Sequence, residues 1–86
     1  MTTKTQHLIE TVQLINNIFK GNEIVTRDLN SLCDTIIHTA PEIINKRWMD
    51  IYRYCSFHFT DTENLRHFKA FNTYNSRYEE YKKLFI

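Results

Sequence analysis

The chain has 86 residues, and eleven Lys and Arg against ten Asp and Glu give it a formal net charge of +1 at pH 7. A chain of this size builds one hydrophobic core, and its near-neutral charge provides no overall field that would attract nucleic acid or anionic lipid. Hydrophobic residues make up 42% of the sequence, which excludes a disordered chain, while one Gly and one Pro are too few for a β-sandwich or a glycine-rich phosphate loop. We therefore predict an all-α fold, a small single-domain bundle of four to five short helices over residues 1–86.

The sequence favours a cytoplasmic protein. Its two cysteines are too few for the disulfide scaffold of a small secreted domain. The first ten residues lack the apolar centre of a signal peptide, and no stretch approaches the roughly 18 apolar residues of a membrane span. We expect a protein that stays in the cytosol and does not insert directly into a membrane.

The first half of the chain predicts two amphipathic helices. Apolar residues recur at helical spacing over residues 4–20, and Gly21 is expected to end this helix in a left-handed conformation. Thr26 is expected to cap the second helix. This helix must stop near Thr39–Ala40, because Pro41 forces the residue before it out of helical geometry.

A third helix is expected from about Pro41 to Phe59, with apolar residues on two sides. One side carries Trp48 and Ile51 and is the natural core face. The opposite side mixes apolar and charged residues, which we call the charged stripe: Ile43, Lys46, Asp50, Arg53, Tyr54 and Phe57. Two explanations stand side by side. Either a later helix of the same chain covers this stripe, or the stripe is left open for a partner or a second copy of the chain.

The last third of the chain predicts a capped helix followed by a break. Thr60–Glu63 has the form of a capping box, and a second box occurs at Ser76–Glu79. Because the apolar stripe changes its spacing between them, we expect a bend or break near Asn72–Ser76. The predicted core of the whole domain comprises Leu8, Val12, Ile15, Phe19, Leu29, Leu32, Cys33, Ile36, Trp48, Ile51, Cys55, Leu65 and Phe68.

Residues able to bind metal or carry out catalysis are sparse. Cys55 and His58 lie one helical turn apart, and Cys33, His38 or His67 could complete a tetrahedral zinc site. Structural zinc normally uses paired ligands on loops, however, and a thiol inside an apolar stripe is commonly a core residue. As a nucleophile and base, the pair lacks an orienting third group and an oxyanion hole. We therefore expect no enzyme activity, no metal site and no cofactor.

Nucleic-acid binding is the alternative function. Eleven of the twelve aromatic residues follow position 47 and are interleaved with basic side chains, and the second and third helices are arranged in sequence like a helix-turn-helix. The would-be reading helix opens with Pro41-Glu42, which faces phosphates poorly. Residues 41–86 carry eight basic and six acidic side chains, so the aromatic residues are better explained as core. A small helical nucleic-acid-binding regulator is accordingly kept only as the second hypothesis.

Two runs of the sequence, residues 45–59 and 68–85, resemble the small cytoplasmic antiholin of T-even bacteriophages, the rapid-lysis III family. The size of the chain and its richness in Asn, Ile and Tyr agree with this resemblance. It implies a non-enzymatic phage protein of the host cytosol, which delays lysis by binding the cytosolic N-terminal segment of the holin. No family residues can be transferred to this chain. If the resemblance holds, the charged stripe is our expected contact surface, with a homodimer as an alternative use of the same face.

Overall fold

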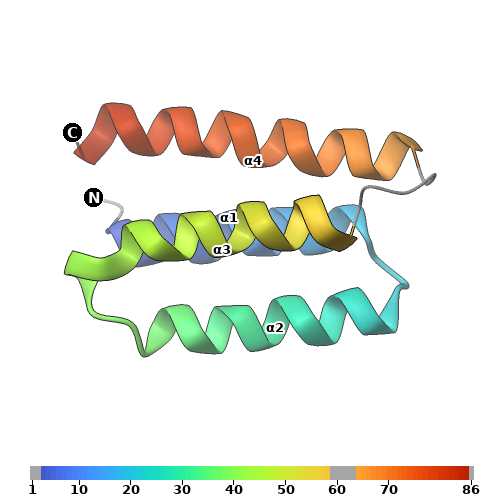
Figure 1. The fold of residues 1–86 in the computed structure, drawn as a ribbon, viewed down its shortest axis with the longest axis horizontal. Helices are drawn as coiled ribbons and strands as arrows, with labels where there is room; N and C mark the ends of the chain where they lie inside the picture. The colour runs from blue at the N-terminus through green and yellow to red at the C-terminus, as the bar shows by residue number, and fades with distance from the viewer. Residues whose placement is uncertain (1–2, 59–63, 86) are drawn as a thin grey trace.

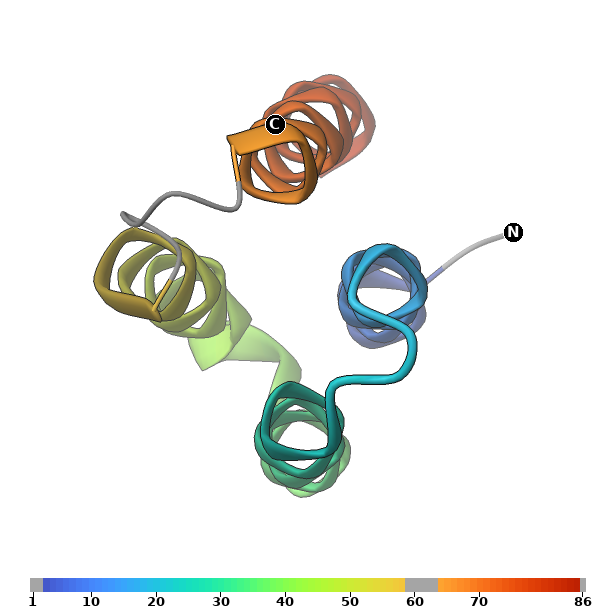
Figure 2. The ribbon, with the colours of Figure 1, turned by 90° about the vertical axis from the view of Figure 1, so that its right-hand side faces the viewer.

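The part of the chain that the structure describes forms four α-helices, which run alternately up and down in an antiparallel bundle (Figure 1). The computed structural model describes residues 3–58 and 64–85, and these ranges contain no strand. Seen end-on, α1 lies beside α2 and α4, and α3 occupies the remaining corner (Figure 2). The predicted all-α bundle is confirmed, with these elements: α1 Lys4–Ile18, α2 Glu23–Ile37, the 3₁₀ turn η1 Pro41–Ile43, α3 Ile44–His58 and α4 Asn64–Phe85.

Both ends of α1 follow from local chemistry. The hydroxyl of Thr3 accepts a hydrogen bond from the backbone N–H of Gln6 at 3.0 Å and caps the start of the helix. After the helix ends at Ile18, Gly21 has a φ of 96°, which confirms its predicted left-handed conformation. This glycine allows the chain to turn sharply into α2.

The predicted start of α2 at Thr26 is wrong. Asn22 is the cap, because its side-chain oxygen accepts a hydrogen bond from the N–H of Val25 at 3.2 Å. Thr26 lies inside the first turn, where its own N–H bonds to the carbonyl of Asn22. Asn is at least as good a cap as Thr, and the earlier start adds a turn that buries Val25 against the core.

The expected break near Asn72–Ser76 is also wrong, since α4 is continuous over 22 residues. The predicted core residue Phe68 is 64% exposed, whereas the small Ala70 is fully buried. With Ala70 instead of Phe68 facing the bundle, the buried positions Ala70, Tyr74 and Tyr81 keep to one side of a straight helix. The second capping box accordingly starts no helix, because Ser76 is an exposed residue inside α4.

Most of the core residues predicted from helical periodicity are buried in the structure. Leu32 and Cys33 are half-buried against it. The side chains of Cys55 and Leu65, the end of the third helix at Phe59 and the box Thr60–Glu63 lie outside the described residues. The confirmed core residues are Leu8, Val12, Ile15, Phe19, Leu29, Ile36, Trp48 and Ile51. The prediction omitted other buried residues, namely His7, Thr11, Val25, Ile44, Ala70, Tyr74 and Tyr81.

Candidate functional site

The residues of the charged stripe lie on η1 and α3. Some of them are exposed to solvent, and others face α2. Ile43, at the end of η1, is 43% exposed. Lys46 is exposed, and the side chain of Arg53 is 76% exposed. The other two described members turn toward α2, and the side chain of Phe57 lies outside the described residues. Three stripe residues are therefore available at the surface of this helix.

The inner edge of the stripe borders a groove between α2 and α3. Tyr54 is half-buried, and its hydroxyl donates a hydrogen bond to a carboxylate oxygen of Asp28 on α2 at 3.3 Å. The intramolecular explanation expected a later helix to cover the stripe, but the helix that lies against Tyr54 is α2. The groove has a volume of about 300 Å³ and is lined by Asp28, Ser31, Leu32, Thr35, Asp50 and Tyr54.

Asp50, the acidic residue of the charged stripe, interacts with two arginines of α3. Arg47 donates to the Asp50 carboxylate at 2.5 Å and to the hydroxyl of Thr39 at 3.2 Å. The guanidinium of Arg53 lies 4.0 Å from the second carboxylate oxygen of Asp50. Because Asp50 is engaged from within the chain, the outward charge of the stripe is positive, carried by Lys46 and Arg53.

A polar cluster that the sequence did not predict joins α1 to α4. The guanidinium of Arg77 donates to the hydroxyl of Thr11 and to the carbonyl oxygen of His7, both at 3.2 Å. It also forms ion pairs with Glu10 at 3.0 Å and Glu80 at 3.1 Å. The Arg77 side chain is only 17% exposed. A charge this deeply placed is stable only when its donors are satisfied, as they are here.

The imidazole of His7 is buried beside this cluster. Its side chain is 3% exposed, and its ring lies 5.7 Å from the ring of Trp48. Burial lowers the pKa of His7, and the positive charge of Arg77 lowers it further, while Glu80 and Glu10 act in the opposite direction. A pKa below its ordinary value of 6.5 favours the neutral form of the imidazole at pH 7. It serves as part of the packed interior.

A weak signal for this cluster was present in the sequence. Arg77 interrupts the aromatic series Tyr74, Tyr78 and Tyr81, and His7 adjoins the apolar stripe of the first helix. Single-helix periodicity treats both as polar residues near an edge. Only the pairing of α1 with α4 shows that they meet.

Aromatic residues form the centre of the bundle. The Trp48 ring lies 5.3 to 5.7 Å from the rings of Tyr74, Tyr78 and Tyr81. The hydroxyl of Tyr74 donates to the Trp48 carbonyl at 3.3 Å, and that of Tyr81 bonds to Asn45. Trp48, Tyr74 and Tyr81 are each at most 4% exposed. These three rings hold the protein together and present no face to a nucleic-acid base.

The described residues contain no group of three His, Cys, Asp or Glu side chains placed to hold a metal ion. Burial raises the pKa of the Cys33 thiol, with a smaller contribution from Asp34, which makes this thiol a poor nucleophile. His38 is exposed at the end of α2. The remaining members of the hypothetical zinc set have side chains outside the described residues: Cys55, His58 and His67.

Comparison with known proteins adds no relative. No family model matches the chain, and no curated protein or solved structure is significantly similar to it. Within residues 3–58 and 64–85, none of the helices combines the length and the apolar character needed to cross a membrane.

Proposed function

We propose that this protein is a non-enzymatic binding protein of the host cytosol whose partner is the cytosolic N-terminal segment of a phage holin. The antiholin resemblance supplies the identity of the partner. The observation that carries the proposal is the exposed part of the charged stripe, where Ile43 of η1 and Lys46 and Arg53 of α3 lie beside the groove between α2 and α3.

This surface has the parts that short-peptide recognition requires. Ile43 offers an exposed apolar anchor, and burying it against a partner removes hydrocarbon from water. Lys46 and Arg53 provide positive charge that sets the register of a bound segment. The groove beside them has Leu32 and the Tyr54 ring in its wall, so a second apolar side chain can be received there.

Two observations favour a protein partner over nucleic acid. In a helix-turn-helix the two helices cross at roughly 90–120°, whereas α2 and α3 lie antiparallel along the bundle (Figure 1). Trp48, Tyr74 and Tyr81, three of the aromatic rings that the sequence offered for stacking on bases, are buried in the core. Nucleic-acid binding therefore remains the weaker hypothesis.

A peptide titration tests the proposal. A fluorescent peptide with the sequence of the holin's cytosolic segment is added to the purified protein, and binding is followed by anisotropy. Wild-type protein should bind it saturably. The variant Ile43→Asp/Lys46→Glu should bind at least about tenfold more weakly, because it loses the apolar anchor and reverses a charge.

Ile37→Asp is the control for this titration, because it makes the same apolar-to-acidic change at an exposed site off the charged stripe. Ile37 is 56% exposed at the end of α2, and its position two residues after Thr35 and five after Leu32 turns it away from the side of α2 that lines the groove. It should bind as the wild type does. If the wild-type protein does not bind the peptide, the holin is not the partner. If both variants lose the same amount of affinity, the charged stripe is not the contact surface.

A further inference from the structure

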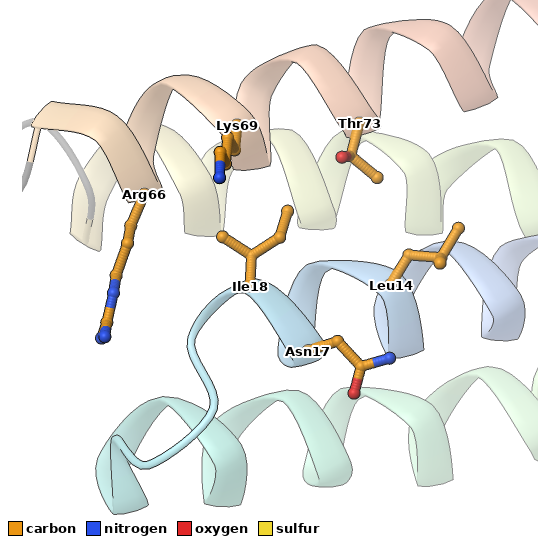
Figure 3. Close-up of a pocket in the computed structure, with 6 residues that line it drawn as sticks. All are labelled: Leu14, Asn17, Ile18, Arg66, Lys69 and Thr73. Atoms are coloured by element: carbon orange, nitrogen blue, oxygen red, sulfur yellow. The ribbon is translucent and has the colours of Figure 1, made fainter.

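A second groove lies on another side of the bundle, between α1 and α4. A hollow of about 520 Å³ is lined by Leu14, Asn17 and Ile18 of α1 and by Arg66, Lys69 and Thr73 of α4, with Leu14 and Ile18 pointing toward α4 (Figure 3). The base of the groove is apolar, since Ile18 is half-buried and Leu14 is 44% exposed. Arg66 also borders a second hollow, which is lined by Lys20, Glu23 and the 63% exposed Ile24, so the two hollows adjoin at Arg66.

The basic residues of this groove differ in one respect from the arginine further along α4. Arg77 is neutralised by Glu10 and Glu80. Within the part of the chain that the structure describes, Arg66 and Lys69 have no carboxylate within 4 Å, although both are exposed. The groove thus combines exposed hydrocarbon with two exposed cations.

We infer that this α1–α4 groove binds an acidic amphipathic helix of a partner protein. Two antiparallel helices form the walls of a trough in which a third helix can lie with its apolar side on Leu14, Ile18 and Ile24. Arg66 and Lys69 are three residues apart on α4, so Asp or Glu residues three or four apart on the bound helix meet both. The inference is independent of the holin proposal, because it concerns different helices and different residues.

The chemistry of the groove fits a peptide better than a polyanion. Nucleic-acid sites use many cations, and each neutralised phosphate adds to a steep dependence on salt. Here three basic residues, Lys20, Arg66 and Lys69, are accompanied by Glu23 and by an apolar base. A surface of this composition is complementary to a ligand that has both apolar side chains and a few carboxylates.

The test uses a designed probe. A fluorescent helical peptide of about 14 residues, about 21 Å long, is made with Leu on one side and Glu flanking it. Its control replaces every Glu with Lys. Wild-type protein should bind the acidic peptide and bind the basic peptide at least about tenfold more weakly.

Three variants separate the groove from the rest of the surface. Lys69→Glu should weaken binding at least about tenfold. Lys83→Glu makes the same charge change on an exposed residue near the end of α4 and should have little effect. Lys46→Glu, in the charged stripe, should also leave this peptide bound, which separates the inference from the holin proposal.

Several results would overturn the inference. The first is that the acidic peptide does not bind saturably up to about 1 mM. The second is that the basic peptide binds as tightly as the acidic one. The third is that Lys69→Glu and Lys83→Glu weaken binding of the acidic peptide equally. Tighter binding of a single-stranded oligonucleotide, lost steeply with salt, would assign the groove to nucleic acid instead. Sedimentation showing a dimer that Lys69→Glu dissociates would assign it to a second copy of the chain.

Discussion

Arg77 and His7 are 70 residues apart in sequence, yet the Arg77 guanidinium donates a hydrogen bond to the His7 carbonyl oxygen at 3.2 Å. This contact, together with the bond from Arg77 to Thr11 and the ion pair with Glu10, ties α4 to the first half of α1. It also places a positive charge beside the buried imidazole. Arg77 therefore contributes both to the pairing of the two helices and, after burial, to the lowered pKa of His7.

Replacing Arg77 with Ala should lower the free energy of unfolding by about 2 kcal/mol, because the His7 carbonyl and the Thr11 hydroxyl each lose a charged donor and two ion pairs are removed. Urea unfolding followed by circular dichroism measures the loss. Arg53→Ala, which removes a 76% exposed arginine, should change the value by less than about 0.5 kcal/mol. Equal losses in the two variants would show that the Arg77 contacts contribute nothing beyond those of a surface residue.

Burial gives His7 a pH effect of definite sign. Its pKa is lowered in the folded protein relative to the ordinary value of 6.5, so the unfolded chain binds the extra proton more readily. The resulting stability is present above about pH 6.5 and is lost as the pH falls below it. The free energy of unfolding should therefore decrease between about pH 7 and pH 5.

Replacing His7 with Gln should flatten this part of the pH profile, whereas His38→Gln, at an exposed site, should retain it. Urea unfolding at a series of pH values gives the comparison, and NMR titration of the His7 ring gives the pKa directly. Parallel profiles for wild type and His7→Gln would contradict the assignment.

Trp48 is the central ring of the aromatic core, so its truncation should be severe. It is 1% exposed and contacts three tyrosine rings of α4. Trp48→Ala should cost about 3–5 kcal/mol, a large part of the stability of so small a domain. Circular dichroism is the measurement, since the chain has one Trp and its fluorescence is lost in the variant. Trp48→Phe should cost less, and a fully stable Trp48→Ala would refute the central role of this ring.

The packed side of α4 can be tested with two substitutions two residues apart. Ala70 is fully buried, so Ala70→Leu should destabilise the bundle by about 1–3 kcal/mol through overpacking. Phe68 is 64% exposed, and Phe68→Glu should change stability by less than about 0.5 kcal/mol. Thermal unfolding of both variants measures the two losses of stability. A larger loss for Phe68→Glu than for Ala70→Leu would show that Phe68, and not Ala70, packs in the core.

The start of α2 gives a further prediction. Asn22→Ala removes the side-chain acceptor for the N–H of Val25 and should cost about 1 kcal/mol. Thr26→Ala should cost clearly less, because Thr26 is not the cap. Urea unfolding of the two variants is sufficient, and a larger loss for Thr26→Ala would move the helix start back to residue 26.

Much of the bundle was accessible from periodicity. The spacing of Leu8, Val12, Ile15 and Phe19 predicted α1 and its buried side correctly, and Gly21 and Pro41 marked real turns. The alternation of apolar and polar positions is a local property of a helix. It therefore identifies a helix and its apolar side without knowledge of any neighbour.

The errors arose where local signals competed. Thr26 and Asn22 are both acceptable caps, and the choice was made by the burial of Val25. In α4, Phe68 is the more hydrophobic residue, but Ala70 occupies the buried position. Close helix packing selects a residue by the space available, which depends on the neighbouring helices.

Composition and helical spacing are local properties of the chain, so they were enough to predict a few amphipathic helices around one apolar core. Which charges meet, and which remain exposed, could be seen only from the way the helices pack. Arg77 is neutralised by acids of both helices, the charged stripe is divided by α2, and Arg66 and Lys69 are left beside exposed hydrocarbon. These outcomes depend on how distant segments pack, since electrostatic and packing energies are set by distance in space.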